Sequence, residues 1–531
     1  MKNNIKKFIA LTITLNIFIF VSQPQLAEAK KYGGTFIKVA PAEPPTMSGE
    51  IGNGVAAFMV ATNIYNLLVR YDYDFKTNPE LAESWKISND GKTYTFKLRN
   101  DVKWHDGVKF TSADVKFSLL EITCKHHNRG KSWCPSIKSI ETAGDYTVII
   151  NLTRAFAPLL TILSDYNTGT LIRPKHIYEK GYDKNNPYVM SPKVGTGPFV
   201  FSKWVKGSHV ELVRNKNYFK KGLPYLDRLV VQFLPDEAGR LAAFENGDLD
   251  MIHSYILPYE HVKRFKKDPR FQVIEHGNEA TATNANLLLN HDNQYLKHKK
   301  VRQAIAMALD KDKITDAAMF GASKAAHAHI GSGVSWIHFP EYDYKQNIAK
   351  SNEMLDAAGF KRGSDGTRFS LRDYWSSGRA FEGRAAQVLR SQLRKVGIDI
   401  KISSFDKPSF VEKVFKKRDF DLAHQLFTTS PDPTLSVVHR YASKNIGRPY
   451  ANAAGWVNKE YDELTTAEVG IVSTAARAAV WRRVCQILMD ELPAYPLHEM
   501  PNMQLVRAGF EDVIMDPAGY YGIHERTYVS N

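Results

Sequence analysis

The sequence predicts an α/β protein with more than one domain. Segments with the two-residue alternation of strands and segments with the period of amphipathic helices follow one another along the whole chain. Helices placed between strands in this way are typical of α/β lobes. The chain has 531 residues, more than one hydrophobic core normally holds, so we expect two or three domains. We find no internal repeat and no low-complexity segment.

The first 29 residues have the pattern of a secretory signal peptide. Three lysines precede an apolar run at residues 8–21, and the small residues Ala27 and Ala29 then offer a cleavage site. The run is shorter than the roughly 20 residues of a membrane-spanning helix, which disfavours the alternative of an uncleaved anchor. No cysteine follows the run, which disfavours a lipoprotein. We expect cleavage after Ala29 and a soluble, exported mature protein.

The stretch KTYTFKLRNDVKWHDGVKFTSADVKFSL at residues 92–119 predicts a strand, a turn, a short strand and a helix. Apolar and polar residues alternate in its first part, and Thr111 followed by Asp114 is typical of a helix start. His105 and Asp106 are residue types that could form a general base or contribute two ligands to a metal site. The pair falls in the Asp-Gly turn, however, and this turn signal needs no catalytic explanation.

Helices and strands continue to alternate after this stretch. Each expected helix has an apolar face or a glycine stop, and each expected strand is a short apolar or alternating run. The expected elements are strands at 147–152, 226–234 and 421–427, helices at 238–247, 301–314 and 475–492, and a helix, glycine stop and strand over 384–405.

The composition is that of a folded protein with excess positive charge. Hydrophobic residues make up 43% and charged residues 24% of the chain, which excludes a disordered protein. The net charge is +15, but the basic residues form short scattered clusters such as 263–267 and 413–418. An exported protein rarely meets nucleic acid, so we interpret this charge as solvated surface and expect no nucleic-acid partner.

The three cysteines divide into two groups. Cys124 and Cys134 flank a polar loop and could close a small disulfide in an oxidising compartment. Cys485 lies on the apolar side of a predicted helix, which favours a buried free thiol.

No catalytic or metal-binding motif stands out. HExxH, GxxxxGK[ST], GxSxG and CxxC are all missing from the sequence. His126 and His127 lie in the cysteine-flanked loop, and His327 and His329 lie in a loop of small residues. Surface or loop histidines without a ligand explain both pairs better than metal ligands do. We therefore expect a binding protein rather than an enzyme, without a cofactor or metal.

Five blocks, in order along the chain, resemble bacterial extracellular solute-binding proteins of family 5, the receptors of ABC importers for oligopeptides, dipeptides and nickel chelates. The first is LAESWKISNDGKTYTFKLRNDVKWHDGVKFTSADVKFSL, and together the blocks span nearly the whole mature chain. They lie at residues 81–119, 194–207, 240–251, 299–314 and 393–433.

The resemblance implies a two-lobed, flytrap-like periplasmic binding protein fold of type II. Lobe one would comprise residues 30–280 and 495–531, with an extra subdomain inserted at about 76–190, and lobe two would comprise residues 281–494. The ligand would lie between the lobes, and an inner-membrane ABC permease would be the partner of a monomeric, periplasmic receptor.

The resemblance also implies where the ligand lies. The segments DYWSSGR and FTTSPDP match positions that line the cleft in the family, and a loop after the N-terminal PPTM enters it. Arg379 is the candidate for a ligand carboxylate. Thr429 occupies the position where peptide-binding members carry an aspartate for the amino group, and Asp432 is a possible substitute. The implied ligand contacts are Ser48, Glu50, Tyr374, Trp375, Arg379, Phe427, Thr428, Thr429 and Asp432.

Three functions remain open at this point. The first is a peptide receptor, which could hold its ligand through backbone pairing without charged side chains. The second is a receptor of the same fold for a metal chelate, haem, an opine, a modified peptide or an oligosaccharide, which the missing aspartate at Thr429 favours. The third is a secreted hydrolase or a chaperone-like peptide holder, but the sequence offers no paired nucleophile and base.

Overall fold

The computed structural model describes residues 30–52, 55–127, 129–165, 170–183, 185–253, 256–257, 259–277 and 279–530. The predicted signal peptide, residues 1–29, lies outside the described residues. Among the helices in these ranges, none has the length and apolar character that crossing a membrane requires.

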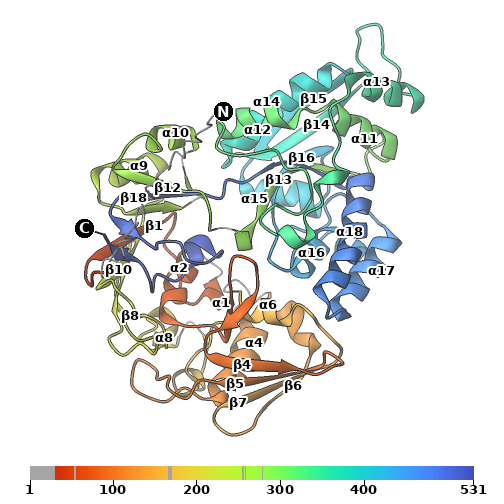
Figure 1. Ribbon diagram of the computed structural model, residues 1–531. Helices are drawn as coiled ribbons and strands as arrows, with labels where there is room; N and C mark the ends of the chain where they lie inside the picture. Colours follow the sequence, from red (N-terminus) through yellow and green to blue (C-terminus); the bar gives the residue numbers. More distant parts are fainter. Residues whose placement is uncertain are drawn as a thin grey trace, which may run out of the picture.

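The protein has the two-lobed α/β fold, and lobe one is built on a seven-stranded mixed sheet (Figure 1). Strand β1 lies inside this sheet, parallel to both β10 and β11, whereas the outer strands pair in the antiparallel sense. In spatial order the strands are β12 (Phe271–Ile274), β18 (Gln504–Arg507), β11 (Met251–His253), β1 (Thr35–Ala40), β10 (Arg228–Phe233), β9 (His209–Arg214) and β8 (Phe199–Val205). The helices of this part are α1 (Gly49–Gly52), α2 (Val55–Ile64), α9 (Glu237–Asn246) and α10 (Val262–Phe265).

An inserted subdomain separates β1 from β8 along the chain. Its four-stranded antiparallel sheet, in the order β4-β5-β7-β6, forms the lower part of the molecule in Figure 1. The strands are β4 (Ala82–Ile87), β5 (Thr93–Leu98), β6 (Ile137–Thr142) and β7 (Thr147–Leu152), and the helices are α3 (Ser112–Phe117), α4 (Cys124–His126), α5 (Gly130–Trp133), α6 (Leu159–Leu163), α7 (Lys175–Tyr178) and α8 (Pro187–Met190). A short pair, β2 (Val69–Tyr71) and β3 (Thr77–Pro79), leads into it.

Lobe two is built on a five-stranded sheet in the order β15-β14-β16-β13-β17. Strand β14 runs parallel to β15 and β16, whereas β13 runs antiparallel to β16 and β17. The strands are β13 (Thr283–Leu289), β14 (Phe369–Ser376), β15 (Ile398–Phe405), β16 (Leu422–Thr428) and β17 (Ala494–Glu499). The helices are α11 (Lys299–Ala308), α12 (Lys311–Met319), α13 (Ile348–Ala357), α14 (Ala380–Arg394), α15 (Lys407–Val411), α16 (Val437–Tyr441), α17 (Lys459–Ala467) and α18 (Thr474–Glu491).

The chain crosses between the two large sheets twice, once between β12 and β13 and once between β17 and β18. The two crossings are bonded to each other, because the Met500 N–H donates to the Thr283 carbonyl (2.7 Å) and the Asn502 amide donates to Glu279 (2.7 Å). The predicted boundary at residue 495 needs correction, since it falls inside β17, which pairs with β13 in the lobe two sheet. We propose boundaries near residues 281 and 500 instead.

Most local predictions agree with the structure. The predicted strands at 147–152, 226–234 and 421–427 correspond to β7, β10 and β16, and the helix, glycine stop and strand over 384–405 correspond to α14, Gly397 and β15. The single helix predicted at 301–314 is wrong. Leu309 is extended there, and the Asp310 side chain accepts from the Lys313 N–H and so starts a second helix.

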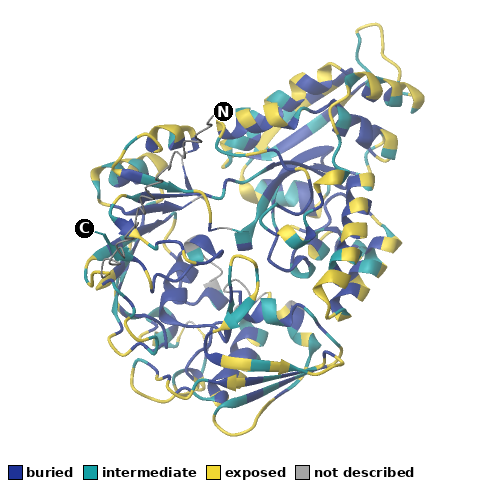
Figure 2. Cartoon of the chain, in the orientation of Figure 1, coloured by how far each residue is buried: buried dark blue, intermediate teal, exposed yellow. Residues whose placement is uncertain are grey.

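Burial follows the layering of the sheets. Figure 2 shows buried strands at the centre of each lobe and exposed outer faces on the surrounding helices. In β13, every residue after Thr283 is buried, because the strand is central in its sheet and covered on both faces. One buried hydrophobic cluster nevertheless continues from lobe one, at Val39 and Phe271, into lobe two, at Leu287, so the lobes also pack against each other.

The predicted disulfide forms. Cys124 and Cys134 are bonded, with Cα atoms 5.7 Å apart, so the loop between them is closed at its base. The third cysteine, Cys485, is a free thiol buried in α18, as the sequence predicted.

We predict that replacing Cys124 and Cys134 together by serine lowers the free energy of unfolding by about 2–3 kcal/mol, because the open loop gives the unfolded chain more conformational entropy. Urea denaturation of the oxidised protein with and without dithiothreitol measures this. The reductant should leave the double serine variant unchanged, and an equal stability of both forms of the wild type would contradict the prediction.

Candidate ligand-binding cleft

A cleft of about 920 Å³ lies between the two lobes. Lobe two contributes the ends of β16 and β17, the start of β13 and the start of α14. Lobe one contributes α2, the disulfide loop and the C-terminal segment, and both chain crossings form the floor. The lining residues include Val55, Arg129, Tyr259, Thr283, Arg379, Leu426, Thr428, Met500 and Tyr521. This volume lies in the range of about 300–1,000 Å³ that is typical of small-molecule sites.

The charged side chains of the cleft are balanced in sign. They are the acids Glu275, Glu279 and Glu499 and the bases Arg129, Lys324 and Arg379. Glu499 accepts from the Ser332 hydroxyl (2.7 Å) and lies 3.6 Å from the Lys324 ammonium. Glu279 accepts from the backbone N–H of Gly277 (2.9 Å) as well as from Asn502. Hydrogen bonds thus hold both acids in place, Glu279 on the first chain crossing and Glu499 at the start of the second.

Two of the nine predicted contacts, Arg379 and Thr428, line this cleft. Arg379 precedes α14 and pairs with Glu382, its Nη1 lying 2.9 Å from Oε1. Burial raises the pKa of Glu382 and the charge of Arg379 opposes that shift. The Thr428 hydroxyl meets the hydroxyl of Thr283 across the β13–β16 pair, at 3.1 Å.

Ser48 and Glu50 are buried in lobe one, where the Ser48 hydroxyl donates to Glu50 (3.1 Å), and neither residue is among those that line the cleft. The Arg173 guanidinium donates to both Glu50 carboxylate oxygens (2.8 and 2.7 Å), and the Tyr182 hydroxyl donates to the same carboxylate (2.7 Å). Burial raises the pKa of Glu50, but the charge and hydrogen bonds of Arg173 outweigh it and leave this pKa below the ordinary value. The pair is a structural ion pair.

Asp432 also has a structural position away from the cleft lining. Its two carboxylate oxygens accept from the Arg477 guanidinium (2.7 and 3.0 Å), and Arg477 donates in turn to Glu468. Asp432 also begins a short helical turn by accepting from the Thr434 N–H (3.0 Å). Both oxygens of the Asp432 carboxylate therefore have partners within lobe two.

The predicted aromatic walls belong to the packing of lobe two instead. Tyr374 is buried with its ring centroid 4.8 Å from that of Phe405, and Trp375 packs against α14 at Gly383. Phe427 is buried against Tyr441. None of the three aromatic residues is among those that line the cleft.

Thr429 is buried beneath the cleft. Its N–H donates to the Ala282 carbonyl (2.6 Å), and its hydroxyl has no hydrogen-bond partner among the residues that the structure describes. The Thr429 side chain therefore lies inside the protein. The acidic residues of the cleft are Glu275, Glu279 and Glu499 instead.

Sequence reasoning missed the residues of the crossings and Arg129. The predicted change of lobe near residue 281 was a usable signal, because the segments that join two lobes lie beside whatever the lobes enclose. Arg129 lies in the disulfide loop, far from the expected contacts in sequence. No local pattern distinguishes it from the other basic residues of this basic chain.

His105 has a structural role in the predicted turn. Its Nδ1 accepts from the Gly195 N–H (3.1 Å), and its Nε2 lies 3.0 Å from the Gly197 carbonyl. A Cβ added at Gly195 would lie 2.0 Å from the Ile64 carbonyl oxygen, so this loop packs closely on the end of α2. Among the described residues, no group of three or more His, Cys, Asp or Glu could hold a metal ion.

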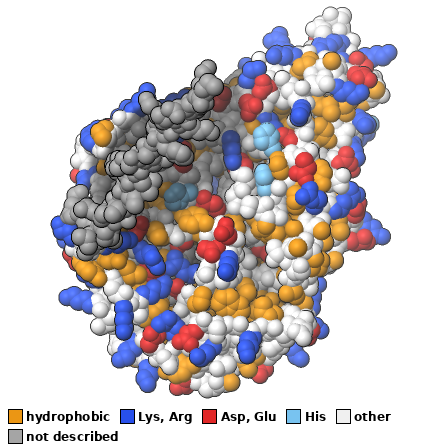
Figure 3. Space-filling model, viewed as in Figure 1, with side chains coloured by type: hydrophobic (Ala, Val, Ile, Leu, Met, Phe, Trp, Pro, Cys, Tyr) orange, Lys and Arg blue, Asp and Glu red, His pale blue; other side chains and the backbone are white. Residues whose placement is uncertain are grey.

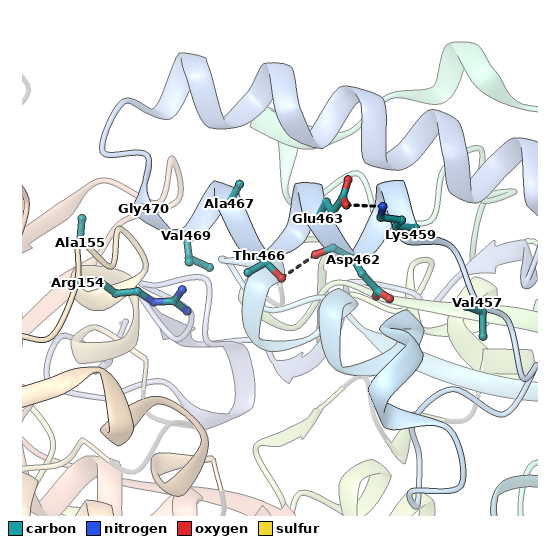
Figure 4. Close-up of a pocket in the computed structure, with 10 residues that line it drawn as sticks. All are labelled: Arg154, Ala155, Val457, Lys459, Asp462, Glu463, Thr466, Ala467, Val469 and Gly470. Carbon is teal, nitrogen blue, oxygen red and sulfur yellow. Dashed lines mark hydrogen bonds and ion pairs between the residues drawn. The ribbon is translucent and has the colours of Figure 1, made fainter.

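A second hollow, of about 860 Å³, lies on the outside of the molecule where the loop after β7 meets α17 (Figure 4). The Ala157 N–H donates to the Val469 carbonyl there (2.8 Å). Several polar side chains that line this hollow bond to other residues of α17. Lys459 pairs with Glu463 at 3.6 Å, and the Thr466 hydroxyl donates to the Asp462 carbonyl. The Lys459 side chain is 90% exposed. We therefore take the inner cleft as the ligand site.

Comparison with known proteins gives a consistent family. The family model described as bacterial extracellular solute-binding proteins, family 5, matches residues 76–448. The oligopeptide-binding protein AppA of Bacillus subtilis is 26% identical over 531 aligned residues, covering 94% of each chain. Heme-binding protein A of Haemophilus influenzae is 28% identical over 491 residues, covering 87% of this chain and 86% of its own. The crystal structure of NikA from Brucella suis in complex with Fe(III)-EDTA has a TM-score of 0.81 at 25% identity, covering 92% of this chain and 98% of that one.

We predict that Glu50→Gln lowers the free energy of unfolding by about 3–5 kcal/mol at pH 7, because it leaves Arg173 buried without its counter-charge. Glu179→Gln, which removes an exposed carboxylate 3.9 Å from Lys175, should cost less than about 1 kcal/mol. Urea denaturation compares the two variants with the wild type.

The same measurement has a predicted pH dependence. Because the folded-state pKa of Glu50 lies below its ordinary value of 4.5, its contribution is fully present above that pH and is lost as the pH falls through the folded-state pKa. The difference between wild type and Glu50→Gln should therefore shrink in acid. A difference that grows below pH 4.5 would contradict this assignment.

We predict that Asp432→Asn destabilises the fold by about 3 kcal/mol through Arg477 and leaves the occupancy of the copurifying ligand unchanged. Thermal unfolding and native mass spectrometry measure the two effects. Asp316→Asn, at an exposed position of α12, is the matched control and should change neither. Loss of ligand from a folded Asp432→Asn protein would contradict the structural assignment and show that Asp432 contributes to ligand binding.

Proposed function

The chain belongs to the bacterial extracellular solute-binding proteins of family 5, and we propose that it is a receptor that binds peptides between its lobes and delivers them to an ABC permease. The matched family is one of binding proteins. Export through the predicted signal peptide, cleavage after Ala29, a periplasmic location and a monomeric state belong to the same proposal.

One observation carries the peptide proposal, namely the mixed charge of the cleft. Three acids and three bases line one cavity. A peptide is a zwitterion, so its ammonium and carboxylate groups find partners of opposite sign in such a cavity, and charge-assisted hydrogen bonds are the strong ones. Glu279 and Glu499 can accept from an ammonium group, a role that the buried Thr429 cannot fill. The name of the relative AppA, an oligopeptide-binding protein aligned over 94% of both chains, supports this choice.

The backbone of the cleft suits an extended ligand. The lining includes the ends of β16 and β17 and the start of β13, and a peptide recognised through main-chain hydrogen bonds needs few specific side chains. Closing the lobes would remove water from these groups and strengthen each interaction. Binding then shifts the equilibrium between open and closed lobes toward the closed form, which differs in the surface it offers to a permease.

A non-peptide ligand is the alternative, since a relative 28% identical is a heme-binding protein. The balanced charge of the cleft favours a zwitterionic peptide over haem, whose macrocycle is apolar and whose two propionates are both acidic.

We predict that native mass spectrometry of the mature protein, purified gently from the periplasm of its own host, shows bound masses that differ by amino-acid residue masses. The same sample unfolded in guanidinium chloride and refolded after dialysis is the ligand-free control, and it should show the bare protein with a lower Tm, because a ligand that binds only the native state stabilises it. One fixed non-peptide mass, or an iron-containing adduct, would overturn the peptide assignment.

A further inference from the structure

Arg440 is a cation at the edge of the cleft, and it has no acidic partner among the residues that the structure describes. It lies on α16, directly after the loop that follows β16, and is partly exposed. Its guanidinium donates to the Thr428 carbonyl and lies 4.7 Å from the Phe427 ring centroid. Among the described residues, no Asp or Glu oxygen lies within 4.0 Å of it.

Two other arginines of lobe two have the acidic partners that Arg440 lacks. Arg477 is matched by Asp432 and Glu468, and Arg379 is matched by Glu382. A half-buried guanidinium is normally paired in this way, since desolvation without a counter-charge is costly. The planar fork of Arg440 is therefore available to bind a carboxylate in two parallel hydrogen bonds.

A second cation faces this place from lobe one. Arg129 lies in the loop closed by Cys124 and Cys134 and lines the same cleft as Thr428. Burial lowers the pKa of Arg440 to about 10, and the positive charge of Arg129 contributes in the same direction. His439, next to Arg440 on α16, also has a pKa lowered by burial and by the charges of Arg440, Arg448 and Arg129. These effects place the positive charges of both lobes near one another.

We propose that Arg440 and Arg129 together form the anion subsite of the cleft and take the carboxylate of the ligand between the lobes. This proposal rests on the proposed function, and it assigns the carboxylate to Arg440 in place of the sequence candidate Arg379, whose charge Glu382 already matches.

The arrangement couples the ligand to closure of the lobes. Arg440 belongs to lobe two and Arg129 to lobe one, so a carboxylate that accepts hydrogen bonds from both guanidinium groups joins the two lobes. The closed form is thereby favoured when an anionic ligand is present, and the disulfide holds the base of the loop that carries one of the two charges.

Two pools of synthetic tetrapeptides made from uncharged residues, one with free C-terminal carboxylates and one amidated, test the subsite. The ligand-free refolded protein is mixed with both pools and its complexes are counted by native mass spectrometry. We expect the wild type to retain the free-acid pool at least tenfold better than the amides. Arg440→Gln should lose at least tenfold in free-acid retention and most of this preference, and Arg440→Lys should lie between.

The matched control is Arg390→Gln, which removes one positive charge from an exposed position of α14 and should behave as wild type. Far-UV circular dichroism and Tm verify that each variant is folded. If Arg440→Gln does not fold, Arg129→Gln tests the same subsite from lobe one and should give the same loss. Equal retention of acids and amides by the wild type, or an undiminished preference in the folded Arg440→Gln protein, would overturn the subsite.

Failure of the wild type to bind either pool would count against the peptide function, and the subsite is then tested with sulfate alone. At equal ionic strength, replacing chloride by sulfate should raise the Tm of wild type and Arg390→Gln more than that of Arg440→Gln and Arg129→Gln. Equal increases in all four proteins would overturn the anion subsite on its own.

Discussion

The hydrogen bonds between the two chain crossings determine where a ligand can lie in this protein. Met500 bonds to Thr283, and Asn502 bonds to Glu279, so the two segments that join the lobes run side by side as one hinge. Lobe two is one continuous insertion between them, from β13 to β17. Both joints lie near one edge of each large sheet, where β12 pairs with β18 and β13 pairs with β17, and the strand ends next to them form the floor of the cleft.

Charge in this protein serves two distinct purposes that burial separates. The ion pairs of Glu50 with Arg173 and of Asp432 with Arg477 are buried and fully bonded, and they fix loops inside single lobes. The charges of the cleft are more open and come from both lobes and the hinge. Elsewhere the excess of basic residues is spread over the surface, and Figure 3 shows Lys and Arg interspersed with Asp and Glu on the visible face. The net charge of +15 thus says little about the ligand, whereas the few charges enclosed between the lobes say much more.

The disulfide loop connects the inserted subdomain to the ligand site. Cys124 and Cys134 lie in the lower part of the molecule, next to the four-stranded sheet, yet the loop that they close carries Arg129 to the cleft. An extra subdomain in lobe one therefore contributes to the cleft as well as enlarging the lobe. The subdomain also contacts lobe two on the outer side of the molecule, where the Ala157 N–H donates to the Val469 carbonyl.

The sequence by itself determined most of the local elements and the family. It also predicted an export signal and made a bond between two cysteines possible. These features depend on neighbouring residues, on fixed spacings and on blocks that keep their order along the chain, as with α14, Gly397 and β15. Sequence reasoning failed for acidic side chains that could bind either a ligand or another residue of the protein. Glu50 and Asp432 are acids in the expected loops, but only the folded chain brings Arg173 and Arg477 to them from distant positions. Conversely, no local sequence pattern identifies Arg129, Glu279 and Glu499 as residues of the cleft. The two chain crossings and the disulfide loop bring them there from distant parts of the sequence. The tertiary structure alone decided which charges were paired inside a lobe and which lie in the cleft between the lobes, because pairing depends on distance in space and not on distance along the sequence.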